Sequence, residues 1–168
     1  MIDYGINSDS LIIVKRNGKE QIIKIDQVVK GDYVRGYDSV EKLECINMVI
    51  EVEKVKLPAD VDLKIWYKQD QCEQTQLICG RAQRFPIWDY EIDNYKYIPA
   101  KDLKCGNILR APNSALVKVD NINIKDCNND NPEFIVLTLS NKANFYVKRV
   151  GVEDESINSF ILTKGQSS

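Results

Sequence analysis

Short apolar runs alternate with polar residues along most of the chain, and no long stretch repeats apolar residues at helical spacing. The runs are rich in Val, Ile, Tyr and Phe and are bounded by Gly, Pro, Asn and Asp, which is typical of strands. The pattern predicts strands over Leu11–Lys15, Gln21–Ile25, Tyr33–Tyr37, Met48–Val55, Leu63–Tyr67, Gln76–Cys79, Arg84–Trp88, Tyr95–Ile98, Asn107–Arg110, Val117–Ile122, Glu133–Leu139 and Phe145–Val152. Many short strands at close spacing indicate an all-β domain.

Two turn signals organise these strands. Asn17-Gly18 lies between two of them and predicts a tight hairpin, because this turn requires positive φ at both central residues. Ile25–Val34 and Ile98–Leu109 share a form, in which a short helical turn is followed by Lys and Gly and then by a strand. This repetition predicts two related halves.

Composition points to an ordinary folded domain. The chain has 168 residues, of which 43% are hydrophobic and 29% charged, and its net charge is −2 with both signs interspersed. A chain of this length builds one core. Because its charges form no basic patch, the sequence gives no indication that it binds nucleic acid. The apolar runs are shorter than the ~20 residues of a membrane-spanning helix, and Asp3 and Asp9 interrupt any signal peptide. We therefore expect no membrane partner and a cytoplasmic, intracellular location.

Cysteine and histidine usage limits the chemistry. The five cysteines are odd in number and form no Cys-x-x-Cys motif, which favours reduced thiols, and the chain has no histidine. A zinc site is therefore not expected, and neither is any other metal or cofactor. The absence of imidazole also removes the commonest general acid and base near neutral pH.

The two ends of the chain resemble a known family. Residues Gly5–Asp38 read GINSDSLIIVKRNGKEQIIKIDQVVKGDYVRGYD, and residues Glu133–Asp154 read EFIVLTLSNKANFYVKRVGVED. These resemble the opening and closing motifs of inteins, members of the Hint superfamily that also contains hedgehog autoprocessing domains. The resemblance implies a horseshoe of bent antiparallel strands with two halves related by a pseudo-two-fold axis. It is of the mini-intein type, because the polar stretch Asp120–Pro132 is too short for a homing endonuclease.

The same resemblance sets the expected domain limits. It places the Hint-like domain at residues 5–154, between a flanking host segment at 1–4 and a C-terminal flanking segment at 155–168. The flanking segments of a larger host protein are then the expected partners, and no small-molecule substrate is expected.

The N-terminal reactive positions of the family are vacated in this chain. The resemblance puts Gly5 where a nucleophilic Cys or Ser begins the acyl shift, and glycine has no side chain to attack a carbonyl. It puts Gly80 and Gln83 where the family has a Thr and a His, and a Gln amide hydrogen-bonds but does not shuttle a proton.

The C-terminal positions differ from the family in the same way. Val136 stands where the family often has an Asp, and Glu153, Asp154 and Glu155 stand where it has His, Asn and a second nucleophile. No catalytic residue is therefore expected. The sequence favours a degenerate, splicing-inactive Hint domain that serves as a structural insert or interaction module of its host.

Two alternatives remain open. An atypical self-splicing or self-cleaving domain could use Asp154, or a junction at Asn158-Ser159, with Ser8, Ser10 or Cys79 as the nucleophile. The chain could also be an unrelated β-rich binding domain that shares only the strand and turn pattern.

Overall fold

A computed structural model describes residues 3–58, 62–68, 74–123, 132–149 and 157–167. Within these ranges the chain is almost entirely strand, with four 3-10 turns between strands. The strands are β1 (Ile6–Asn7), β2 (Ser10–Arg16), β3 (Lys19–Lys24), β4 (Tyr33–Asp38), β5 (Leu43–Lys56), β6 (Asp62–Lys68), β7 (Thr75–Gly80), β8 (Arg84–Asp89), β9 (Asn94–Pro99), β10 (Ile108–Arg110), β11 (Leu116–Asn123), β12 (Glu133–Leu139), β13 (Asn144–Arg149), β14 (Ile161–Lys164) and β15 (Gln166–Ser167). The 3-10 turns are η1 (Ile25–Gln27), η2 (Ala100–Asp102), η3 (Pro112–Ser114) and η4 (Ile157–Ser159).

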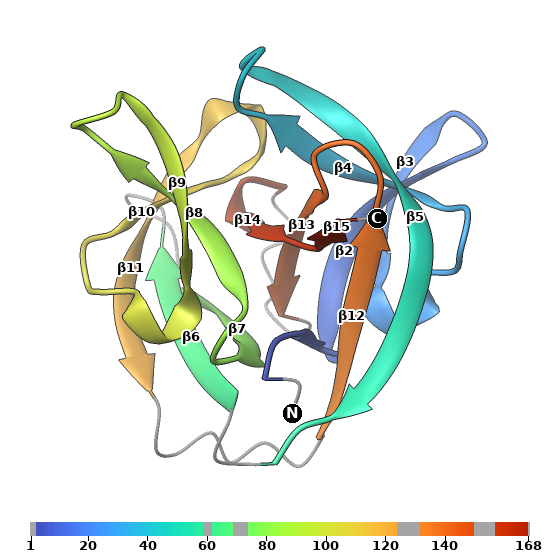
Figure 1. The fold of residues 1–168 in the computed structure, drawn as a ribbon, viewed down its shortest axis with the longest axis horizontal. Coiled ribbons are helices and arrows are strands. Elements are labelled where there is room, and N and C mark those ends of the chain that lie inside the picture. The colour runs from blue at the N-terminus through green and yellow to red at the C-terminus, as the bar shows by residue number, and fades with distance from the viewer. Residues whose placement is uncertain (1–2, 59–61, 69–73, 124–131, 150–156, 168) are drawn as a thin grey trace.

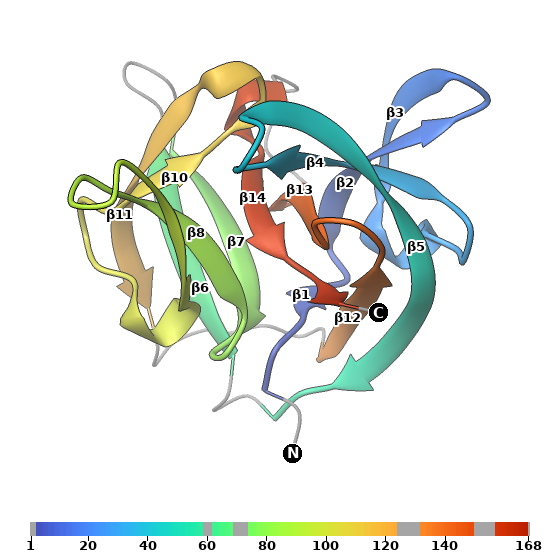
Figure 2. The same cartoon turned by 45° about the horizontal axis from the view of Figure 1, so that its top comes forward.

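The strands form one long, curved sheet that folds into two lobes. Its order is β14-β13-β2-β4-β5-β12-β1-β7-β6-β11-β10-β8-β9, with β3 paired to β2 and β15 paired to β12. One lobe contains β2 to β5 and β12, and the other contains β6 to β11 (Figure 1). β13 and β14 lie between the lobes in both views (Figures 1 and 2). The all-β horseshoe expected from the sequence is confirmed.

The expected strands are present, and three more accompany them. β5 begins five residues before its expected start and spans 14 residues, and residues 150–152 of the last expected strand lie outside the described ranges. The additional strands are β1, β14 and β15. β14 pairs with β13 from Asn144↔Lys164 to Val147↔Ile161. The packed fold therefore extends through part of the segment that we expected to flank the domain.

The two lobes repeat one backbone motif, which confirms the predicted relation between halves. In the first copy, Gly31 has φ +95° and its N–H donates to Val49, while Val49 donates to Asp32. In the second copy, Gly106 has φ +92° and its N–H donates to Val119, while Val119 donates to Asn107.

Side chains repeat as well. The Asp32 carboxylate accepts from the Val29 N–H at 3.0 Å, and the Asn107 amide oxygen accepts from the Lys104 N–H at 2.7 Å. In each copy, the left-handed backbone of the glycine lets the chain pass from the helical turn into the next strand.

The core runs through both lobes. The strands of both lobes contribute fully buried side chains, among them Ile12, Val34, Leu63, Phe85 and Val147. The Asn17-Gly18 turn has φ +53° and +76°, as the hairpin prediction requires. The helical elements of the described residues are three-residue turns, and none of them is long enough to cross a membrane.

Candidate functional site

The N-terminal segment is built into the centre of the sheet. β1 lies between β7 and β12, with Ile6 opposite both Cys79 and Ile135. The backbone upstream continues this pairing, since the Gly80 N–H donates to the Gly5 carbonyl at 3.0 Å and the Ala82 N–H donates to the Asp3 carbonyl at 2.8 Å. The peptide before Gly5 is therefore held against β7.

Gly5 has a backbone conformation that disfavours any other residue, and its surroundings are tight. Its φ is +128°, in the region that L residues rarely adopt, and a Cβ there would lie 3.3 Å from the Phe134 Cβ. A nucleophile at this position would require a different local backbone. The backbone at this position therefore has a conformation that suits glycine.

Gly80 is required by the close approach of the N-terminal segment. A Cβ built on Gly80 would lie 2.7 Å from the Asp3 carbonyl carbon and 2.8 Å from the Tyr4 Cα. Real Cβ atoms do not approach backbone so closely. Residues 3 and 4 therefore occupy the space into which a Thr side chain at position 80 would project.

Gln83 joins the two ends of the domain. Its side-chain oxygen accepts from the Gly5 N–H at 2.9 Å. Its nitrogen donates to the Thr163 hydroxyl at 2.8 Å and to the Lys164 carbonyl at 2.6 Å. Gln83 is 4% exposed, so these bonds satisfy a buried amide that would otherwise be costly.

Thr163 and Lys164 are site residues that the sequence analysis missed. The Thr163 hydroxyl accepts from Gln83 and donates to the Arg84 carbonyl at 2.8 Å, so it is hydrogen-bonded in both directions. The signal was the apolar run Phe160–Leu162, which is buried and starts β14. We placed this run in a flanking segment because the motif resemblance ended at Asp154.

Of the remaining family positions, the structure describes only Val136. Val136 is buried on β12 and lines a small space together with Gln83 and Gly165. Thus Gly5, Gly80, Gln83 and Val136 are brought together. Glu153, Asp154 and Glu155 lie outside the described residues.

The alternative nucleophiles are part of the packed fold. Cys79 is 0% exposed in the hydrophobic core, and Ser10 is fully buried on β2. Ser159 lies in η4, where its carbonyl accepts from the Tyr67 hydroxyl at 2.9 Å and its hydroxyl accepts from the Lys148 ammonium at 3.0 Å. The side chain of Asn158 is not among those described.

Asn144, in the closing motif, connects β13 to the rest of the site. Its amide exchanges two hydrogen bonds with the Tyr37 backbone, at 2.9 and 2.8 Å, and donates to the Tyr97 hydroxyl at 3.0 Å. Its backbone carbonyl accepts from the Asn47 amide at 2.7 Å. Burial raises the pKa of the Tyr97 phenol, so Tyr97 stays neutral near pH 7. The hydrogen bond from Asn144 holds Tyr97 against β13.

The Gln83 amide and the Thr163 hydroxyl form hydrogen bonds that connect the two ends of the domain. Around Gly5 the described side chains offer an amide and a hydroxyl, and both are fully engaged. Among the residues that the structure describes, no three His, Cys, Asp or Glu side chains gather as metal ligands.

Structural comparison identifies the fold. An intein from a hyperthermophile has a TM-score of 0.74 at 13% identity over 96% of this chain and 99% of that chain. The gp41-1 intein has a TM-score of 0.67 at 19% identity over 96% and 98%. A bacterial intein-like domain from Clostridium thermocellum has a TM-score of 0.69 at 11% identity over 98% and 100%. No protein-family model matches the chain, and no curated protein matches it either.

The fold is therefore the Hint fold of inteins and intein-like domains. The matches to these three structures cover 96–98% of this chain. The chain therefore shares a whole fold with these proteins, and not only a pattern of strands and turns. At sequence identities below 20%, these matches establish the fold only. The activity has to be argued from the residues of the site.

Proposed function

We propose that this chain is a splicing-inactive Hint domain that serves as a structural insert of a larger host protein. The observation that carries the proposal is the double engagement of the Gln83 amide, with Gly5 on one side and Lys164 on the other. An amide held in this way bonds both ends of the domain and moves no proton. Gly5 supplies no nucleophile next to it.

The positions of the two ends support the role of an insert. Tyr4 lines one pocket together with Gln166 and Ser167, so the chain enters the fold and leaves it at the same place. A domain with neighbouring ends can be carried in a host loop without separating the strands or helices on either side.

The alternative junction at Asn158-Ser159 gains no support from the packing around it. Both the carbonyl and the hydroxyl of Ser159 are hydrogen-bonded. The chain then continues into Phe160 and β14, which are buried in the core. A cut there would divide the packed domain rather than release a flanking segment.

The test is a fusion in which the chain lies between two tag proteins of different mass. Expression followed by denaturing gels should give one full-length product. Ligated tags, or fragments ending at Tyr4, Asp154 or Asn158, would overturn the proposal. The same fusion with Gln83→His asks whether imidazole alone restores chemistry, and we expect it to remain intact because Gly5 still lacks a nucleophile.

A second experiment tests the insert role separately. The chain is placed in a surface loop of an enzyme whose activity is easily assayed. Neighbouring ends predict that the enzyme keeps its activity and that both domains unfold as in isolation. Loss of enzyme activity with the Hint domain still folded would argue against the role of an insert.

A further inference from the structure

A pocket of about 440 Å³ opens beside the Gln83 contacts. It is lined by Tyr4, the turn that carries Gln83 and Arg84, and the end of the chain from Lys164 to Ser167. A space of this size accommodates a small ligand. Two cationic side chains, Arg84 and Lys164, border it from different strands.

The two cations share one aromatic platform. The Arg84 guanidinium carbon lies 5.8 Å from the centroid of the Tyr97 ring, and the Lys164 ammonium lies 5.3 Å from the same centroid. Tyr97 is held by its hydrogen bond to Asn144, and Lys164 also donates to the Lys142 carbonyl at 3.0 Å. Both charges are thus positioned before any ligand arrives.

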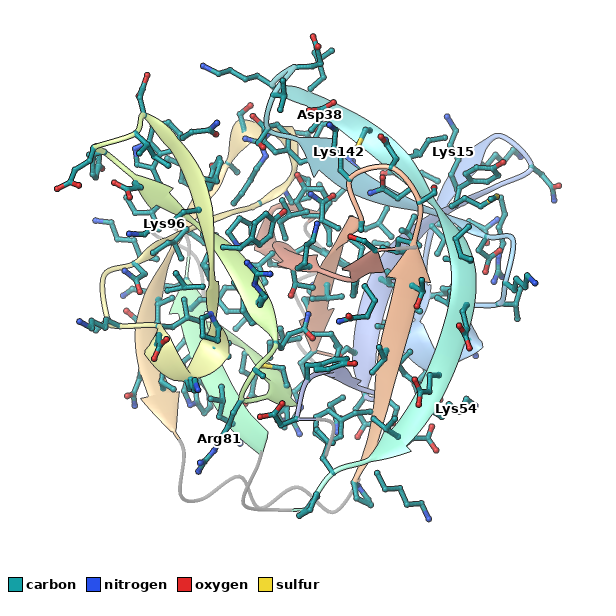
Figure 3. All side chains as sticks on the ribbon, in the orientation of Figure 1. Lys15, Asp38, Lys54, Arg81, Lys96 and Lys142 are labelled. Atoms are coloured by element: carbon teal, nitrogen blue, oxygen red, sulfur yellow. The ribbon has the colours of Figure 1, made fainter. Side chains whose placement is uncertain are left out.

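No carboxylate of the described residues neutralises this pair. The ion pairs within the described ranges include neither Arg84 nor Lys164. The neighbouring Lys142 has its own partner, Asp38, at 3.7 Å, and Figure 3 shows the two side by side.

Burial and two neighbouring positive side chains act on the Lys164 ammonium. Burial lowers the pKa of the Lys164 ammonium, and the positive charges of Arg84 and Lys142 lower it further. A bound anion would relieve this repulsion, which is the condition that favours anion binding over an empty pocket.

We propose that this pocket binds a small dianionic oxyanion of the phosphate class, held between Arg84 and Lys164. The planar guanidinium donates two parallel hydrogen bonds to an oxyanion, and the ammonium adds a compact charge. Two cations match a dianion better than a monoanion. The pocket shares Gln83 with the candidate functional site.

Titration of the full chain with inorganic phosphate at low ionic strength tests the proposal, with NMR amide shifts as the readout. Saturable shifts should gather at Gln83, Gly165 and Gln166. Arg84→Met and Lys164→Met should each weaken phosphate binding about tenfold. Lys101→Met, which removes an exposed cation of another surface cleft, should leave it unchanged. Acetate should bind more weakly than phosphate.

Arg84 is exposed, so we expect the Arg84→Met variant to fold. This variant keeps the test decisive even if the Lys164→Met variant misfolds.

A phosphoserine peptide serves as a second ligand. Tighter binding of the peptide than of phosphate supports the site and assigns its ligand to a phosphorylated chain, and the reverse order supports a free anion. Equal phosphate affinity in Arg84→Met and the unmodified chain, or shifts that map elsewhere, overturns the proposal.

Discussion

The Gln83 side-chain oxygen lies 2.9 Å from the Gly5 nitrogen, and the nitrogen of the same amide lies 2.6 Å from the Lys164 carbonyl oxygen. One buried amide therefore spans the place where the chain enters the domain and the place where it leaves. In a fold shared with inteins, this amide joins the two ends of the domain.

Gln83→Met should lower the free energy of unfolding by about 2–4 kcal/mol, because it leaves the Gly5 N–H and the Lys164 carbonyl buried without partners. Urea unfolding followed by fluorescence measures the change. Gln166→Met is the matched control, since Gln166 is exposed in the same pocket, and it should change stability by less than about 0.5 kcal/mol. Equal effects of the two substitutions would show that the hydrogen bonds of Gln83 do not stabilise the domain.

Gly80→Ala should destabilise the domain through a clash with residues 3 and 4. We expect a loss of about 1–3 kcal/mol. The same substitution in a chain that begins at Gly5 should cost much less, because the clashing backbone is gone. A double-mutant cycle from thermal unfolding gives the coupling between Gly80 and the N-terminal segment. Zero coupling would contradict the observed packing.

Asn144→Ala removes the amide that binds both backbone groups of Tyr37 and the Tyr97 hydroxyl. Buried partners are left unsatisfied, so we expect a loss of roughly 3 kcal/mol. Asn121→Ala, an exposed residue on β11, should be nearly neutral. If Asn144→Ala is also nearly neutral in denaturant unfolding, the network does not stabilise β13.

Asp32 predicts how stability depends on pH. The Arg16 guanidinium donates to both carboxylate oxygens of Asp32, at 2.9 and 2.7 Å, and with the Val29 N–H it holds the pKa of that carboxyl below its usual range. Because the pKa of Asp32 is lower in the folded state, its ionised carboxylate stabilises the fold fully above the unfolded pKa of about 3.9. This stabilisation is lost as the pH falls below that value toward the lower folded pKa. Asp32→Asn should therefore destabilise the domain near pH 7 and flatten the acid limb of its stability curve. An acid limb identical to that of the unmodified chain would contradict this assignment.

The strand pattern was predictable because β6 and β11 alternate between buried and more exposed residues, whereas β2 and β12 are short apolar runs bounded by polar residues. β1 is only two residues long and carries no periodicity, so its pairing with β7 and β12 appears only in the fold. β14 was missed although Phe160–Leu162 is apolar, because four residues give too little pattern to override the motif boundary.

The candidate site was predictable in part. The resemblance named Gly5, Gly80, Gln83 and Val136 as family site positions, and the structure places these four residues close together. It gave no information on what the Gln83 amide binds, because Thr163 and Lys164 are 80 and 81 residues away along the chain. Contacts of that separation depend on tertiary packing and leave no local signal.

The central claim is that this Hint fold breaks no peptide bond of its own. The most direct measurement is the intact mass of the purified two-tag fusion after prolonged incubation with strong thiol at neutral pH. We predict one species at the full-length mass, because Gly5 offers no nucleophile and Gln83 no transferable proton. A species reduced by the mass of this chain, or fragments that divide the fusion at either end of the domain, would contradict the claim.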